Sequence, residues 1–311
     1  MLRTRFFLIC TFLCVIFSTN RIVAGDYYSN ALRIFNEKKF FEASIEFERA
    51  IFYETDVNRI ALFKYYKSIC YKELGDNAKT LDELGGINLF NISDSLYFLI
   101  RYQQAVSNYL TNNPDQALWN IGELRFRIPD SAKIIKIIPI NILCLNATRK
   151  WDEAHRLWNY LLGNSGLDSL RKAGFRSEID NLYTRRNLPG FHSPKKAETL
   201  SRFIPGAGQM YSGAVAEGSV NFLINASVLS FALYEFYSEY YLTGYFVGLG
   251  LFNKTYHGGM HRATLLAEQR NREALSKFNL KNSSLMIRLI DSGNPLLKPI
   301  ENLYILQNTD Q

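Results

Sequence analysis

The side chains best suited to chemistry are two histidines, His257 and His261, which stand four residues apart at the end of an apolar region. Residues four apart share one face of a helix, so these imidazoles could bind one metal ion together. A metal site of this kind also needs a third ligand, and no acidic residue stands close to them in the sequence. We therefore expect an interfacial polar cluster here, with no metal and no cofactor.

A glycine-rich stretch opens the same apolar region, and its notable residues are Pro205, Gly206, Gly208, Gln209, Tyr211 and Gly213. This stretch is not a phosphate-binding loop, because no Lys-Ser/Thr pair follows it and no strand precedes it. Elsewhere, no pattern assembles a nucleophile with a base or two carboxylates in one cleft. We expect a protein that is not an enzyme. An activity that depends on His257 and His261 is a third possibility, which loss of activity in His261→Ala would reveal.

The elements that must position these residues begin with a repeat in the first half of the chain. Small residues recur every 37 positions, and apolar residues keep the same phase around them: Ala43, Thr80, Ala117 and Ala154, followed four positions later by Phe47, Leu84, Ile121 and Trp158. A fixed period of this size is typical of a solenoid, in which each helix pair buries its apolar face only by stacking on the next. We expect four helix pairs.

The repeat resembles the tetratricopeptide repeat. In the first unit, residues of the required types stand at that family's positions: Tyr27, Ala31, Phe40, Ala43, Phe47 and Ala50. The second unit departs from the pattern at Asn77 and Thr80, and the period exceeds the family's usual 34 residues. The resemblance covers residues 26–165. It implies an α-solenoid whose first helices line a concave surface that binds a protein or peptide.

The predicted partner-binding groove is aromatic and aliphatic. Its residues fall at equivalent places in the first helices of the first three units: Tyr28, Tyr65 and Tyr102, with Leu32, Ile69 and Val106. Such a surface suits an extended or helical peptide, oriented by the tyrosine hydroxyls. The alternative is that these side chains pack against a neighbouring helix or the chain's own C-terminal helix. The family's Lys/Asn clamp is not reproduced, so we expect no ligand that ends in a peptide carboxylate.

The first 25 residues have the pattern of a secretory signal peptide. Arg3 and Arg5 precede an apolar run that is too short for an ordinary membrane span, and a small-residue end follows at Ala24-Gly25. An uncleaved anchor is the alternative, because Ile22 stands where a small residue is favoured. Removal of this segment takes away three arginines and lowers the net charge from +7 to +4. No dense Lys/Arg stripe indicates nucleic-acid binding.

The mature chain would keep two cysteines, Cys70 and Cys144, at the same position of the second and fourth units. Stacked helices lie about 8–10 Å apart. Two units of separation therefore exceed the limit of about 7 Å between the Cα atoms of a disulfide. We expect two free, buried thiols.

The C-terminal half changes in composition, and no Lys or Arg occurs from Phe203 to Asn253. Two apolar helices are expected there, at about 218–237 and 241–256, and the first is long enough to cross a bilayer. Asn221 and Asn225 could hydrogen-bond across this hairpin. The turn is rich in the aromatic residues typical of a membrane interface: Tyr234, Phe236, Tyr237, Tyr240, Tyr241, Tyr245 and Phe246.

The motif Pro205-Gly206-x-Gly208-Gln209-x-Tyr211-x-Gly213 before such a hairpin resembles the TM2-like membrane proteins of bacteria. It is also similar to bacterial proteins that join tetratricopeptide repeats to a hairpin of this kind. The resemblance covers about residues 200–270 and implies a small integral membrane module without a known reaction. A soluble, buried α-hairpin is the alternative.

The sequence therefore predicts an all-α protein: a tetratricopeptide-like solenoid of four helix pairs plus a C-terminal hydrophobic hairpin. The expected segments are a signal peptide (1–25), repeats (26–165), a capping helix and linker (166–200), a membrane hairpin (201–262) and a charged helix and tail (263–311). The expected function is a non-enzymatic adaptor, exported to the periplasmic side and membrane-associated. The alternative is a component of an envelope assembly or membrane-insertion machine whose hairpin contacts client membrane segments.

Two signals for membrane topology disagree. Basic residues on both sides of the hairpin, such as Arg202 and Arg262, favour a cytoplasmic location for both flanks. The signal peptide places the repeats outside, and we give it more weight because its apolar run is unambiguous. The partner and the oligomeric state do not follow from the sequence.

Overall fold

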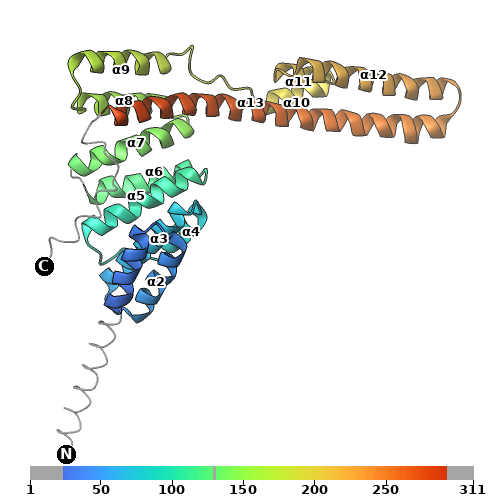
Figure 1. The fold of residues 1–311 in the computed structure, drawn as a ribbon. Helices are drawn as coiled ribbons and strands as arrows, with labels where there is room; N and C mark the ends of the chain where they lie inside the picture. The colour runs from blue at the N-terminus through green and yellow to red at the C-terminus, as the bar shows by residue number, and fades with distance from the viewer. Residues whose placement is uncertain (1–23, 129–130, 293–311) are drawn as a thin grey trace, which may run out of the picture. The chain divides into compact units, whose positions relative to one another are not determined.

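The computed structural model describes residues 24–128 and 131–292, which form helices joined by turns and loops and contain no β-strand (Figure 1). They form two compact units, a helix-pair unit (24–176 with 288–292) and a hairpin unit (Ser177–Ile287). The expected signal peptide lies outside the described residues except for Ala24 and Gly25, which are helical. The end of the tail, 293–311, also lies outside them.

The helix-pair unit begins with helical residues 24–36 and continues in consecutive antiparallel pairs. The helices that follow are α2 (Phe40–Tyr53), α3 (Val57–Glu73), α4 (Asn77–Gly85), α5 (Asp94–Leu110), α6 (Pro114–Arg127), α7 (Ser131–Ala147) and α8 (Trp151–Gly163). The second helices of the pairs start at 40, 77, 114 and 151, an interval of 37 residues each time. The period that is visible in the sequence is thus also the period of the helix boundaries.

The turn inside each pair repeats with the same interval. One residue per turn has a left-handed backbone, with φ between 60° and 80°: Lys38, Gly75, Asn112 and Arg149. The next residue donates its N–H back to a carbonyl five residues earlier, as in Lys150 to Leu145 at 2.8 Å. This is the Schellman ending of a helix, which satisfies carbonyls that the last turn leaves unpaired. The equivalent turns explain why each second helix folds back at the same place.

The core of the helix-pair unit is built on the small residues of the repeat. Ala43, Thr80, Ala117 and Ala154 are all 0% exposed. A small side chain at these positions allows the two helices of a pair to approach closely. The larger residue four positions on, such as Phe47 or Trp158, is then buried beside it.

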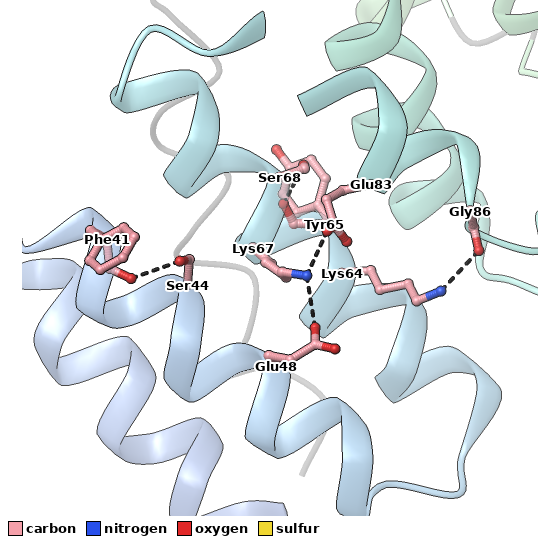
Figure 2. A network of polar contacts seen from close by, with 9 residues as sticks. All are labelled: Phe41, Ser44, Glu48, Lys64, Tyr65, Lys67, Ser68, Glu83 and Gly86. Atoms are coloured by element: carbon pink, nitrogen blue, oxygen red, sulfur yellow. Dashed lines mark hydrogen bonds and ion pairs between the residues drawn. The ribbon is translucent and has the colours of Figure 1, made fainter. Parts of the chain in front are cut away.

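A lysine joins three consecutive helices in this unit (Figure 2). The Lys67 ammonium lies 2.8 Å from a Glu48 carboxylate oxygen on α2 and also contacts the Glu83 carboxylate on α4. Burial lowers the pKa of Lys67, but hydrogen bonds and charges from the two glutamates outweigh it, so that the pKa lies above its ordinary value. Lys67 therefore stays charged and ties the first helix pair to the second.

Cys70 and Cys144 are free and buried, which confirms the expectation from the repeat. Burial raises the pKa of each thiol from 9.0 to about 12. Only the thiolate reacts with maleimide. We expect no labelling of either cysteine in the folded protein at pH 8 and labelling of both in urea, measured by mass spectrometry. Rapid labelling of the folded chain would show that this core is open.

The hairpin unit contains the end of α9 (Ser169–Leu182), then α10 (Pro194–Phe203), α11 (Ala207–Tyr211) and α12 (Val215–Tyr237). The return limb passes through a π-helical segment (Thr243–Leu249) into α13 (Gly250–Asp291). In Figure 1, α12 and the start of α13 lie side by side, with α10 and α11 at the base of the hairpin. The sequence predicts that the second helix ends near Tyr256, but α13 continues without a break through Gly258 and Gly259.

Candidate functional site

The glycine-rich motif forms the base of the hairpin. Gly206 has φ = 91°, a left-handed conformation that favours glycine, and a Cβ on it would overlap the Gly218 carbonyl oxygen at the start of α12. Gly208 packs directly on α10, where a Cβ would overlap the Ala197 carbonyl oxygen. Its N–H donates to the Ser201 hydroxyl at 3.0 Å. The glycines therefore allow α10, α11 and α12 to meet at backbone distance.

The side chains of the motif tie the same base to its neighbours. The Tyr211 hydroxyl accepts a hydrogen bond from the Ser193 N–H at 3.2 Å, and the Lys196 ammonium lies 5.2 Å from the centre of the Tyr211 ring. Gly213 has φ = 88° and leaves room for the Arg270 guanidinium of α13. The motif thus has a structural role: it joins α10 and α11 to both limbs of the hairpin.

A chain of polar side chains crosses the hairpin, and we call it the amide ladder: Gln209, Asn221, Asn225 and Thr255. The Asn221 amide donates to Gln209 Oε1 at 3.0 Å, and the Asn225 amide donates to Asn221 Oδ1 at 2.7 Å. The Thr255 hydroxyl then donates to Asn225 Oδ1 at 2.9 Å. Gln209 and Asn225 are 2% and 1% exposed. Hydrogen bonding inside the ladder offsets the cost of burying these amides.

The two limbs pack against each other along a narrow seam. On α12 the buried residues are Gly218, which packs on Gly206 and Met210 of the base, and Asn225 and Ala232, which face the return limb. Facing them, Gly248 packs against Ala232, where a Cβ would lie 2.5 Å from the Ala232 Cβ, and Gly259 packs against the Asn221 amide. Small residues thus permit the close approach that the ladder needs.

Large apolar side chains point away from the seam along both limbs. They include Phe222, Leu223, Leu233, Tyr237, Tyr241, Leu242, Tyr245 and Phe246, which are 45–88% exposed. Among the described residues, α12 is the one helix long and apolar enough to cross a membrane, and 17% of its most apolar 18-residue window is buried. A core helix of a soluble protein would have most of that window covered.

Removal of one ladder member should weaken the hairpin measurably. Asn225→Ala leaves the Asn221 oxygen and the Thr255 hydroxyl without this partner, so we expect a loss of about 1–2 kcal/mol in unfolding free energy in detergent. Asn253→Ala is the matched control, because Asn253 is exposed. Thermal unfolding followed by circular dichroism would compare the two variants. An equal effect of both would contradict the role of the ladder.

The predicted groove residues lie in or against the core of the helix-pair unit. Tyr65 and Ile69 are buried at 8% and 2% exposure. Tyr102 and Val106 are partly buried against the same cluster, and burial raises the pKa of Tyr102. Tyr28 stacks on Phe63 with ring centroids 4.4 Å apart, and Leu32 packs beside it. These contacts are those of the alternative, in which the side chains pack against neighbouring helices. Binding of a partner through these residues stays a prediction.

Two further features contain side chains that could take part in chemistry. His257 and His261 are exposed, and no group of three or more metal-ligating side chains occurs in the described parts of the chain. A cavity of about 280 Å³ lies among α6, α7 and α8, with Arg125, Asn141 and Tyr160 as the polar members of a lining that is otherwise apolar. Neither feature brings a nucleophile to a base.

Sequence reasoning found part of this site. It singled out the motif residues and expected Asn221 and Asn225 to bond across the hairpin, but it missed Gln209 and Thr255 as their partners. Gln209 and Thr255 are polar residues in an apolar segment, and a buried polar side chain needs a hydrogen-bond partner. Their residue types were the signal that could have identified them. No protein-family model, curated protein or solved structure matches this sequence.

Proposed function

We propose that this protein is a non-enzymatic, membrane-associated adaptor. Its hairpin of α12 and the return limb is embedded in a bilayer, and its helix pairs act as a tetratricopeptide-like solenoid that binds a protein or peptide. The N-terminal segment directs export, so the repeats act on the periplasmic side.

One observation carries the membrane part of the proposal. The hairpin buries a thin seam of small and amide residues and exposes large apolar side chains on its remaining faces. A helix that is apolar all round is normally covered by protein or by lipid. Backbone groups are paired within the helices and the buried amides are paired within the ladder, as a lipid environment requires.

A polarity-sensitive fluorophore tests this assignment in the full chain. It is attached to Phe246→Cys near the turn or to Leu280→Cys on α13, two positions that are 70% and 67% exposed. Cys10 and Cys14 are changed to Ser, while Cys70 and Cys144 are buried. With phospholipid vesicles we expect a blue shift and protection from an aqueous quencher at position 246 alone. Equal spectra at both positions would contradict insertion of the hairpin.

The repeating helix pairs support the partner-binding part of the proposal. Exposed apolar residues recur at equivalent positions of α2 and α6, as Ile45 with Trp119 and Phe52 with Phe126. They offer accessible surface besides the predicted groove, and exposed aromatic residues are frequent in protein interfaces.

Deletion separates this proposal from an assembly or insertion machine. If a chain without residues 201–262 still captures the same partner from a solubilised envelope extract, the repeats bind the partner. Partner capture that is lost with the hairpin would favour the second function, in which the exposed hairpin contacts client membrane segments.

A further inference from the structure

Several Lys and Arg residues of α10 and α13 lie at the base of the hairpin. Sequence alone shows that the stretch without Lys or Arg is bounded by Arg202 and Lys254. In the structure the Tyr256 hydroxyl donates to the Arg202 carbonyl oxygen at 2.6 Å, so the two boundaries of this stretch lie side by side. The opposite end of the hairpin carries two acidic residues, Glu235 and Glu239, and no basic one.

Three more basic residues lie at the same end. Lys196 stacks on the Tyr211 ring, and the Arg270 guanidinium lies against Gly213. Arg262 contacts the Glu217 carboxylate with two nitrogens, at 2.7 and 3.2 Å. We call these five residues the basic cluster: Lys196, Arg202, Lys254, Arg262 and Arg270. Among the described residues, their acidic partners are Glu198, which pairs with Arg202, and Glu217, so positive charge is in excess.

The distance of the basic cluster from the turn of the hairpin matches the thickness of a bilayer. At about 1.5 Å per helical residue, Lys254 is about 22 Å from Glu239 along the limb and Arg262 is about 35 Å from it. The hydrocarbon core of a bilayer is about 30 Å thick. When the turn reaches one interface, the two basic residues therefore bracket the other one. A lysine that lies slightly too deep extends its ammonium along the helix to the headgroups.

We propose that the basic cluster binds the headgroups of anionic phospholipids, and this inference rests on the proposed insertion of the hairpin. Lipid phosphates are the ligands: the exposed guanidinium and ammonium groups complement their charge. The proposal therefore implies that the leaflet that contacts the hairpin base is rich in anionic lipid.

Vesicle flotation of the full chain tests the inference. The protein is diluted from detergent into vesicles of phosphatidylcholine alone or of phosphatidylcholine mixed equally with phosphatidylglycerol. We expect at least about 10-fold stronger partition into the anionic vesicles at low salt, because each basic residue near such a surface contributes about a 5-fold factor. Added salt should reduce the difference.

Matched double variants locate the effect. Arg202→Gln with Lys254→Gln should lower partition into the anionic vesicles by up to about 25-fold, a factor of about 5 for each charge removed. Lys277→Gln with Lys281→Gln, which removes two exposed charges farther along α13, should leave it unchanged. Equal partition of the unchanged protein into both vesicles would overturn the inference and leave insertion standing. Failure to float with either vesicle would remove the proposed insertion as well. Competition by inorganic phosphate, beyond that of chloride at equal ionic strength, would indicate a site for a soluble anion instead.

Discussion

Gly208→Ala should lower the unfolding free energy of the hairpin unit by about 3 kcal/mol or more, as overpacking of a closely packed contact does. The new methyl group would overlap the Ala197 carbonyl oxygen and lie 2.5 Å from the Ser201 hydroxyl oxygen. Neither is the flexible end of a long side chain, so α10 and α11 must separate. Chemical denaturation in mild detergent, followed by circular dichroism, measures the loss.

Gly250→Ala is the matched control for this change. Gly250 lies in a helix of the same hairpin, and nothing lies within 4 Å of the position that its Cβ would occupy. Alanine is the better helix former, so this variant should be neutral or more stable by up to about 1 kcal/mol. If Gly208→Ala proved as stable as Gly250→Ala, the close contact at the hairpin base would be wrong.

Trp158→Ala should lower the unfolding free energy of the helix-pair unit by about 3–5 kcal/mol. Trp158 is 0% exposed and stands at the same repeat position as Phe47, Leu84 and Ile121, which are also buried. Removal of a fully buried indole from α8 leaves a cavity that the surrounding side chains fill only in part. Urea unfolding followed by circular dichroism measures the effect.

Tyr160→Ala on the same helix controls for the loss of an aromatic side chain. Tyr160 is 47% exposed, so its truncation should cost less than about 1 kcal/mol. Similar losses in the two variants would mean that the fourth helix pair does not follow the packing of the first three.

The repeating helices could be predicted because their signal is local. The interval of 37 residues is fixed by small residues such as Ala43 and Ala117, which must stand where helices approach closely, and by turn residues such as Gly75 and Asn112, whose left-handed backbone ends a helix. Both requirements act within one helix pair. Residue type and spacing therefore determine the helix boundaries.

The surroundings of the predicted groove residues could not be predicted in the same way. The spacing shows that Tyr28, Tyr65 and Tyr102 occupy equivalent positions, but their exposure depends on how each helix pair rotates against the next. In the structure, Phe63 stacks on Tyr28, and the first three helix pairs cover Tyr65 and Tyr102 to different degrees. Such long-range packing leaves no local pattern.

The composition of the hairpin site could be predicted, but most of the hydrogen-bond partners of its polar side chains could not. The absence of Lys and Arg marked the apolar segment, and Asn221 with Asn225 indicated a polar contact across it. The partners of those amides, Gln209 and Thr255, lie 12 residues before Asn221 and 30 residues after Asn225. The role of Gln209 depends on how α11 packs on α12. The role of Thr255 depends on the register of the return limb against α12, which the close contacts at Gly248 and Gly259 determine.

An alkaline-carbonate wash of membranes that contain the full chain tests the central claim most directly. Carbonate at high pH releases proteins held by charge or by contacts with other proteins, and it leaves proteins whose apolar segments lie in the bilayer. We predict that the protein stays in the membrane pellet after the wash, detected by blotting. Release into the supernatant would mean that the hairpin is a soluble α-hairpin, and it would contradict the membrane-embedded adaptor.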